Sequence, residues 1–427
     1  MALDSGPSKK VVPHGERAVM LTEKEKLDIL ALLGIELNQV KDLDILLERV
    51  LSEARHFTNA DAGSIYIRHG DLLHFTYTQN DTLQQRLPKG EKLIYSTFSM
   101  PIHQKSIAGY VAATGDTLNL PQVEDIPATA PYSFDRSFDE KSGYSTCSMY
   151  TIPLRTTRGD ILGVLQLINA KNESDQIAVF PSEDEHMMQN FASLASVALE
   201  RAQMTRAILL RMIRMAELRD PKETGAHVNR VAGYTVEIYE EWARRHELSR
   251  KELDTNRDSL RMAAMLHDVG KVAISDLILK KPGRFDQDEF EIMKQHTVLG
   301  ARLFLDTQSD FDEAAGEVAM NHHERWDGKG YPGHVDVFNQ PLPGYVRPDG
   351  KARGKIEREI PLYGRLVALA DVYDALSSAR VYKEAWDEGK VLSTITQERG
   401  SQFDPELVDI FFAKLDVLRS IQERYKE

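Results

Sequence analysis

The sequence has one cysteine, no excess of basic residues and no long apolar run, and each shortage excludes a class of protein. Cys147 alone can form no intramolecular disulfide and no cysteine-rich zinc site, which fits a reducing compartment. The formal charge of −13 argues against a protein that coats DNA or RNA. No apolar stretch reaches the roughly 20 residues that cross a bilayer, and the N-terminus lacks a signal-peptide profile. We therefore expect a cytoplasmic protein with neither a membrane nor a nucleic-acid polymer as partner.

The length of 427 residues allows two or three domains, and a composition of 42% hydrophobic and 28% charged residues is ordinary for globular protein. Residues 1–20 carry no apolar period and are predicted to form a flexible tail. Helical periodicity starts near Leu21, where Thr22 and Glu25 have the spacing of a capping box. This helix is expected to continue to about Gln39.

Residues 42–172 alternate between helical and strand patterns. Residues 62–68 and 72–80 are predicted to pair around a Gly70 turn, and residues 149–155 and 161–170 form a second predicted hairpin. Between the hairpins, we expect a short helix that ends at Gly115, followed by an extended strand. A half-covered antiparallel sheet is the expected result.

These segments resemble a GAF domain, a small-molecule sensor module with a central antiparallel sheet and helices on one side. IAGYVAATGDTLNLPQV, SGYSTCSMYTIPL and GDILGVLQLINAKN carry the resemblance. It implies an α+β sensor domain over residues 21–184, including the preceding helix. Five residues are similar to the pattern of cyclic-nucleotide-binding GAF domains: Asn169, Lys171, Phe180, Asp184 and Glu185. A cyclic nucleotide ligand and a purely structural role of these residues both stay open.

Residues 185–217 read as one long helix that links the sensor to the C-terminal part of the chain. Apolar and small residues recur at alternating steps of three and four, the spacing of a coiled-coil seam. They are Met188, Phe191, Ala195, Ala198, Ala202, Thr205, Leu209, Met212 and Ala216. The pattern favours a parallel homodimer, and the alternative is a stripe that docks on the chain's own domains.

Histidines and carboxylates gather in the remaining sequence at positions that would otherwise be apolar. Glu223 and His227 stand four residues apart, so a helix would project both toward one metal ion. His267 and Asp268 end an apolar helical run, where buried polar groups need partners. His296, His322, His323 and Asp371 repeat that arrangement. A lone histidine of this kind is usually a satisfied core residue, but eight groups exceed the needs of one octahedral ion and suggest two or three.

Three motifs in order give this region a specific resemblance: HDVGK from His267, HHERWDGKGYP from His322 and RVYK from Arg380. The region resembles the HD-GYP family, a branch of the metal-dependent HD phosphohydrolases, over roughly residues 205–427. The resemblance implies an all-α domain over residues 218–427. It also implies hydrolysis of cyclic di-GMP to pGpG or GMP at two or three iron or manganese ions.

The resemblance assigns roles position by position. Asp268 is the expected bridge between metal ions, and Glu223 with His227 matches the extra pair of a three-metal site. The implied metal ligands are Glu223, His227, His267, Asp268, His296, His322, His323 and Asp371. Imidazole and carboxylate without thiolate suit Fe(II) or Mn, with zinc left open.

Other residues are expected to act on the substrate or behind the ligands. Lys271 lies one helical turn beyond His267 and is placed to contact a phosphate or the attacking water. Tyr331 offers a ring and hydroxyl to the substrate, and Arg380 with Lys383 matches the family's substrate-binding basic pair. For each basic residue, an exposed helix charge is the alternative. Asp327 and Asp374 are expected to orient ligating imidazoles.

A phosphodiester repels nucleophiles, and paired metal ions can neutralise its charge and activate water, so no nucleophilic serine or cysteine is required. We expect a GAF-regulated cyclic di-GMP phosphodiesterase. One alternative is an enzyme for cyclic GMP-AMP, and another is a non-catalytic cyclic dinucleotide receptor, which the complete ligand set disfavours.

The connection between Tyr331 and the helix that carries Asp371 departs from the family. Residues 334–360 are rich in glycine, proline and basic residues, where family members usually have a short connection. The two readings are a lid that adds Arg or Lys to the site, and a surface extension.

Overall fold

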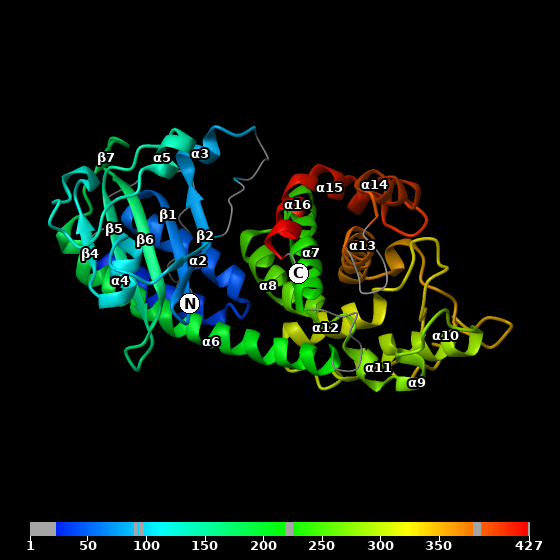
Figure 1. Cartoon of the computed structure of the whole chain (residues 1–427). Helices are drawn as coiled ribbons and strands as arrows, with labels where there is room; N and C mark the ends of the chain where they lie inside the picture. The colour runs from blue at the N-terminus through cyan, green and yellow to red at the C-terminus, as the bar shows by residue number, and fades with distance from the viewer. Residues whose placement is uncertain (1–22, 89–92, 94–97, 218–224, 379–385, 426–427) are drawn as a thin grey trace, which may run out of the picture. The chain divides into compact units, whose positions relative to one another are not determined.

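The computed structural model describes residues 23–88, 93, 98–217, 225–378 and 386–425 (Figure 1). It divides into two compact units. The first contains Met1–Gln39 and Leu47–Glu200, and the second contains Val40–Leu46 and Arg201–Glu427. The predicted tail and Thr22 lie outside the described residues.

The first unit is built on a seven-stranded sheet in the order β3-β2-β1-β6-β5-β4, with β7 paired to β6. Every neighbouring pair is antiparallel. The strands are β1 (Ala60–His69), β2 (Leu72–Asn80), β3 (Ser99–Pro101), β4 (Leu118–Leu120), β5 (Met149–Arg155), β6 (Ile161–Lys171) and β7 (Ile177–Ala178). Both predicted hairpins, β1 with β2 and β5 with β6, are confirmed.

Helices and short 3-10 turns complete the first unit. They are α1 (Glu23–Gln39), α2 (Leu43–Thr58) from Leu47 onward, α3 (Asp81–Gln85), α4 (Ile107–Thr114), α5 (Ser137–Ser142), η1 (Val123–Asp125), η2 (Ser182–Asp184) and the first half of α6 (Glu185–Glu217). The helix α1 ends at Gln39 as expected, and α6 has the expected bounds, whereas the expected start near Leu21 lies outside the described residues. The helix α4 ends as expected at Gly115, whose φ of 77° suits glycine.

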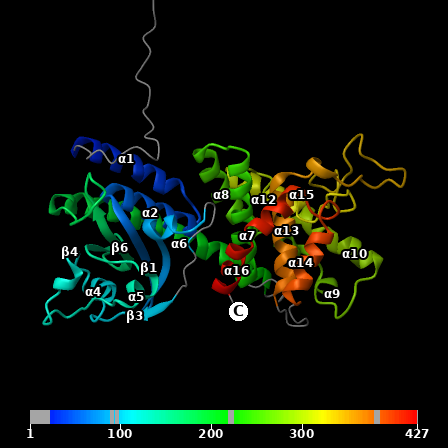
Figure 2. The same cartoon turned by 90° about the horizontal axis from the view of Figure 1, so that it is seen from above.

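The expectation of a half-covered sheet is wrong for the central strands. Residues 60–67 of β1 are all buried, so both faces are covered. On one face, Leu51 of α2 lies against Gly63. On the other, Tyr66 and Val164 pack in a cluster with Val111 of α4. Figure 2 shows α2 and α4 on opposite sides of β1 and β6.

The five residues of the cyclic-nucleotide pattern tie the end of β6 and the start of α6 to their neighbours. The amide oxygen of Asn169 accepts from the N–H of Cys147 (2.8 Å), and its amide nitrogen donates to the carbonyl of Ser145 (2.7 Å). Lys171 forms an ion pair of 2.6 Å with buried Asp61. Asn119 donates to the carbonyl of Phe180 and to the carboxylate of Glu185, while Asp184 ends η2. These contacts serve the fold, and a cyclic nucleotide ligand stays a prediction.

The predicted seam of α6 is largely buried within the single chain. Its first five members are among the buried core residues: Met188, Phe191, Ala195, Ala198 and Ala202. Met212 is exposed, and the side chain of Ala216 lies outside the described residues. The first half of the stripe therefore packs on its own chain, the alternative that the sequence left open.

The second unit is helical, as expected. Its helices are the second half of α6, α7 (Gly225–Arg245), α8 (Arg250–Met265), η3 (Val269–Ala273), α9 (Asp276–Leu279), α10 (Gln287–Lys294), α11 (His296–Arg302), α12 (Asp310–Asn321), η4 (Glu357–Glu359), α13 (Leu362–Ser377), α14 (Glu388–Gln397), α15 (Pro405–Ala413) and α16 (Leu415–Arg424). The helix α7 packs on α8 and α13, and α12 packs on α8, α11 and α13. Across the described ranges, no helix combines the length and apolar character needed to cross a membrane.

Residues 40–46 belong to the second unit through charged contacts. The carboxylate of Asp258 on α8 accepts from the backbone N–H groups of Lys41 (3.1 Å) and Asp42 (2.7 Å). Arg261, one turn further along α8, forms ion pairs with Asp42 and Asp44. All these charged groups are buried or nearly so, so removal of one partner would leave a buried charge without its counterpart.

Candidate metal centre

The HDVGK motif places two predicted ligands directly after α8. The helix ends at Met265, and His267 and Asp268 follow in the turn that leads into η3. Gly270 lets this turn approach α11, because a Cβ at that position would lie 1.9 Å from the carbonyl oxygen of His296. The motif therefore fixes Asp268 beside the first residue of α11.

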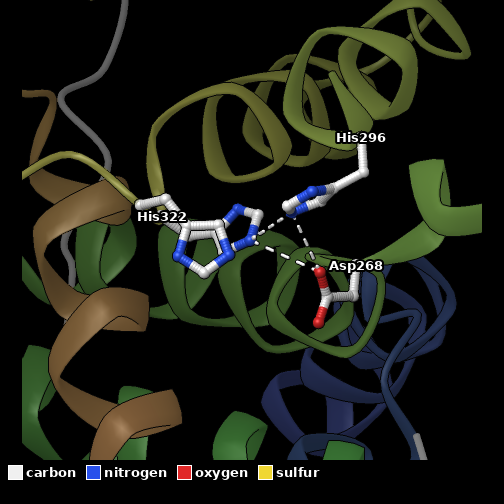
Figure 3. A group of neighbouring side chains, drawn as sticks. Asp268, His296 and His322 are labelled. Atoms are coloured by element: carbon white, nitrogen blue, oxygen red, sulfur yellow. Dashed lines mark hydrogen bonds and ion pairs between the residues drawn. The ribbon is translucent and has the colours of Figure 1, made fainter. Parts of the chain in front are cut away.

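Four predicted ligands form a first cluster, which consists of Asp268, His296, His322 and His323. Their ligand atoms all lie within 4.8 Å of one another. Asp268 Oδ1 is 3.2 Å from Nε2 of His296 and 3.6 Å from Nε2 of His322. Figure 3 shows these three side chains converging from the turn before η3, from α11 and from the end of α12.

The second nitrogen of each buried ring fixes its orientation. Nδ1 of His267 lies 2.9 Å from the carbonyl oxygen of Ala264, and Nδ1 of His296 lies 2.7 Å from that of Met293. Nδ1 of His322 lies 3.1 Å from the carbonyl of Val318. A carbonyl only accepts, so each Nδ1 carries a proton, and in the neutral form of each ring the lone pair on Nε2 points toward the cluster.

This arrangement fits a bound cation. Nε2 of His296 and Nε2 of His322 lie 3.4 Å apart, and two lone pairs at that distance repel each other. A metal ion between them would turn the repulsion into ligation, with the backbone carbonyls fixing the rings from behind. The donor set of three imidazoles and one carboxylate is appropriate for a divalent transition metal.

Three more predicted ligands form a second cluster, which consists of His227, His267 and Asp371. Asp371 Oδ1 is 3.7 Å from Nε2 of His227 and 3.9 Å from Nε2 of His267. Asp268 Oδ2 is also 3.2 Å from Nε2 of His267. Asp268 thus stands between the two clusters, with one oxygen toward each.

Asp374 contacts a ligand from behind. Its carboxylate is 2.8 Å from Nδ1 of His227 and accepts from Arg230 Nε at 2.7 Å. Burial raises the pKa of Asp374, but the hydrogen bonds with His227 and Arg230 outweigh it and lower the pKa. Asp374 therefore orients an imidazole, as expected. The role of Arg230 was not predicted from the sequence, although Arg230 stands only three residues after the predicted ligand His227.

Asp327 was also expected to orient an imidazole. It instead contacts Arg325 and Lys329.

Charge in the first cluster favours the forms that bind metals. Burial raises the pKa of the Asp268 carboxyl, but Lys271 and His267 hold it well below its usual range. Burial lowers the pKa of His322 and, together with the charges of neighbouring rings, brings that of His323 well below its usual range. An ionised Asp268 carboxylate beside neutral rings of His322 and His323 is the protonation state that ligates a cation.

The predicted substrate residues differ in how the structure places them. Tyr331 stacks on His323, with ring centroids 4.8 Å apart. Lys271 donates to Asp268 Oδ2 at 2.7 Å. Arg380, Lys383 and the predicted ligand Glu223 lie outside the described residues.

Known protein families match both the N-terminal and the C-terminal part of the chain. Residues 42–199 match the GAF domain family, residues 224–376 match the HD domain family, and a second HD domain family matches residues 347–407. Among solved structures, the GAF domain of an Acinetobacter phosphoenolpyruvate-protein phosphotransferase aligns at 16% identity and a TM-score of 0.32, covering 44% of this chain and 99% of that one.

Two curated relatives come from Vibrio cholerae. A protein named cyclic di-GMP phosphodiesterase is 35% identical over 62% of this chain and 51% of its own length. A protein named 3'3'-cGAMP-specific phosphodiesterase 2 is 35% identical over 47% of this chain and 33% of its own length. The chain thus spans between a third and about half of the relatives it matches. It combines an N-terminal GAF domain with a C-terminal HD domain.

Proposed function

We propose that the second unit hydrolyses a phosphodiester bond of a cyclic dinucleotide, with cyclic di-GMP as its substrate. The observation that carries this proposal is the position of Asp268 between two clusters of buried imidazoles and carboxylates. A relative named cyclic di-GMP phosphodiesterase, 35% identical over 62% of this chain, supports the choice of substrate.

The residues of the two clusters would hold two divalent ions, with iron or manganese suited to donors that lack thiolate. Bound there, the ions would neutralise a phosphodiester and make water a nucleophile near neutral pH. Glu223, which lies outside the described residues, would complete a third site next to His227. The protein's own part is to orient the imidazoles through backbone carbonyls and Asp374, and to exclude bulk water by burying them.

Two side chains at the edge of the first cluster would act on the substrate. Lys271 carries an ammonium group 2.7 Å from Asp268 Oδ2, where it can contact a phosphate oxygen. Tyr331 extends the stack that starts at His323 and offers its ring to a base. Arg380 and Lys383 remain the proposed basic pair for the substrate.

Regulation and assembly form a second part of the proposal. We propose that the GAF domain controls turnover in response to a small ligand, with cyclic nucleotides as the first candidates. A dimer would use the exposed face of α6, because much of the predicted seam is buried within the chain. Large apolar side chains on that face are at least 42% exposed: Met204, Ile208, Met212 and Met215. The domain limits and the cytoplasmic location stay predictions.

A second candidate substrate is cyclic GMP-AMP. It is favoured by the relative named for the cGAMP-specific reaction, which is 35% identical over 47% of this chain. The alternative without catalysis is a receptor that binds a cyclic dinucleotide and releases it unchanged.

Product analysis separates these functions. The full chain, reconstituted with Mn(II) or with Fe(II) under anaerobic conditions, is incubated with cyclic di-GMP and with 3'3'-cGAMP, and the products are resolved by chromatography. We expect pGpG or GMP from cyclic di-GMP, abolished in His322→Ala. The control His246→Ala removes an imidazole that contacts Glu406 outside both clusters, and should retain activity. Faster turnover of 3'3'-cGAMP would favour the second candidate, and binding without products would identify a receptor.

A further inference from the structure

Residues 334–354 form an ordered double turn. A backbone bridge pairs Val335 with Pro341, and another pairs Val346 with Ala352. The N–H of His334 donates to the carbonyl of Arg353 at 2.9 Å, which closes the base of the segment. The rings of His334 and Tyr345 stack with centroids 3.7 Å apart. Residues 334–354 therefore have a defined backbone conformation, which we call the double turn. The sequence alone also allowed a surface extension.

The double turn and the GYP loop line an open cavity of about 510 Å³. Its lining includes Lys294 of α10, Tyr331 of the GYP loop, and Arg347 and Lys351 of the double turn. The volume falls within the range of about 300–1,000 Å³ typical of small-molecule sites.

The lining of this cavity is basic in a chain whose net charge is −13. Its charged side chains are Lys294, Lys329, Arg347 and Lys351 against the single carboxylate of Glu291. Glu291 contacts two of the four cations, Lys294 at 3.0 Å and Lys351 at 3.4 Å. Asp327 and Asp349, which do not line the cavity, contact Lys329 and Arg347. Four cationic groups therefore face three carboxylates in and beside the cavity, an excess of one positive charge that suits an anion.

Tyr331 connects this cavity to the metal centre. Its ring lines the cavity and also stacks on His323 of the first cluster, at 4.8 Å between centroids. Lys294 Nζ is 5.6 Å from the centroid of the same ring. Only the ring of Tyr331 therefore separates Lys294 of the cavity from His323 of the first cluster, so a single dinucleotide can reach both.

We propose that this cavity binds the phosphate of the cyclic dinucleotide that is not being cleaved, through Lys294, Arg347 and Lys351. This inference rests on the proposed function, since it assumes a substrate with two phosphates. Arginine can hold a phosphate by two parallel hydrogen bonds, and lysine adds a point charge. The double turn would thereby distinguish a cyclic dinucleotide from a phosphodiester with one phosphate.

The test compares two substrates on one variant. Arg347→Gln with Lys351→Gln removes two cations whose side chains are 55% and 60% exposed, so folding should be unaffected. We expect the KM for cyclic di-GMP, and its Kd from calorimetry, to rise about tenfold or more. The kcat/KM for bis-p-nitrophenyl phosphate, which has one phosphate, should stay unchanged. The control Lys280→Gln with Arg284→Gln removes the same charge from residues that do not line the cavity and should alter neither substrate.

The possible outcomes test the cavity inference and the proposed function separately. An unchanged KM and Kd for cyclic di-GMP in the cavity variant overturns the inference and leaves the proposed function intact. An equal loss on both substrates also overturns it, because the residues would then support the metal centre. A wild-type chain that cleaves bis-p-nitrophenyl phosphate but neither binds nor cleaves a cyclic dinucleotide overturns both statements. If the double variant misfolds by circular dichroism, Lys351→Gln alone is measured in the same way, with a smaller rise expected.

Discussion

The Nε2 atoms of His296 and His322 face each other at 3.4 Å, while the Nδ1 atoms of both rings donate to backbone carbonyls. Neither ring can turn away without leaving a buried polar group unsatisfied. The backbone of α11 and α12 thus keeps two lone pairs directed at one point. A site built in this way is preorganised for a cation before any cation binds.

The first prediction concerns the metal content of this site. His322→Ala removes one of the converging imidazoles, and we expect the metal bound per chain to fall, with the second cluster retaining its ion. Inductively coupled plasma mass spectrometry on purified, reconstituted protein measures the change. The control His246→Ala should bind as much metal as the wild type, and equal metal content in both variants would contradict the assignment of the first cluster.

Asp374 gives the second prediction, because it connects the second cluster to the core. Its carboxylate lies 2.8 Å from Nδ1 of His227 and pairs with Arg230. Asp374→Asn should weaken metal binding by about 10–100-fold, the usual effect of losing a group that orients a ligand. Asp374→Ala should also cost about 3–5 kcal/mol of unfolding free energy, since it leaves the buried Arg230 without its carboxylate. Metal titration and urea denaturation measure the two effects.

Asp327→Asn serves as the matched control for Asp374→Asn. Asp327 contacts Arg325 and Lys329, and no imidazole contact to it occurs among the described residues. Its variant should bind metal as tightly as the wild type. Equal weakening in both variants would mean that loss of negative charge, and not the orientation of His227, controls affinity.

The sequence predicted features that depend on local chemistry. The hairpins were visible in strand alternation around Gly70 and Gly159, and the end of α4 in Gly115, because turns and caps depend on a few adjacent residues. The residues of both clusters were visible as histidines and carboxylates within apolar helices. Contacts between distant segments were not visible. Arg230 behind Asp374 and the second covering of the sheet by α4 arise from tertiary packing, which periodicity does not report.

The α6 stripe shows the same limit. A spacing of three and four predicts an apolar face but not what covers it, and Phe191 and Ala195 are covered within their own chain. The double turn at residues 334–354 is a further case. Its composition indicated a loop, while its role as a cavity wall depends on Arg347 lining the same cavity as Tyr331 and Lys294.

Gly270 gives the third prediction. A Cβ there would lie 1.9 Å from the carbonyl oxygen of His296 and 2.4 Å from the backbone nitrogen of Gly300. Gly270→Ala must therefore push η3 away from α11 and separate Asp268 from His296. We expect a loss of about 3 kcal/mol or more in unfolding free energy, together with lost metal binding. Thermal and urea denaturation of the metal-free protein measure the first effect.

Gly316→Ala is the control for this packing argument. Its added Cβ would meet Phe304 at 3.6 Å, an ordinary contact, within the helix α12. Because alanine favours helix over glycine by roughly 1 kcal/mol, this variant should be as stable as the wild type or more stable. Similar destabilisation of both variants would show that the close approach at Gly270 is not the cause.

The last prediction concerns pH and Asp258, which holds residues 40–42 in the second unit. Burial raises the pKa of Asp258 to about 6, although the N–H groups of Asp42 and Lys41 oppose the shift. The folded protein then binds a proton that the unfolded chain releases near the ordinary value of 3.8. The contribution of Asp258 to the free energy of unfolding is thus fully present below pH 3.8 and is lost as the pH rises to about 6. The loss amounts to at most about 3 kcal/mol.

Two variants separate the charge of Asp258 from its hydrogen bonds. Asp258→Asn cannot ionise, so its unfolding free energy relative to the wild type should increase as the pH rises through this window, measured by urea denaturation of the metal-free chain. Asp258→Ala should show the same relative increase. It should also be less stable at every pH by about 1–3 kcal/mol, because the backbone donors of Lys41 and Asp42 lose their acceptor. A difference between Asp258→Asn and the wild type that does not vary with pH would mean that Asp258 titrates alike in the folded and unfolded chains.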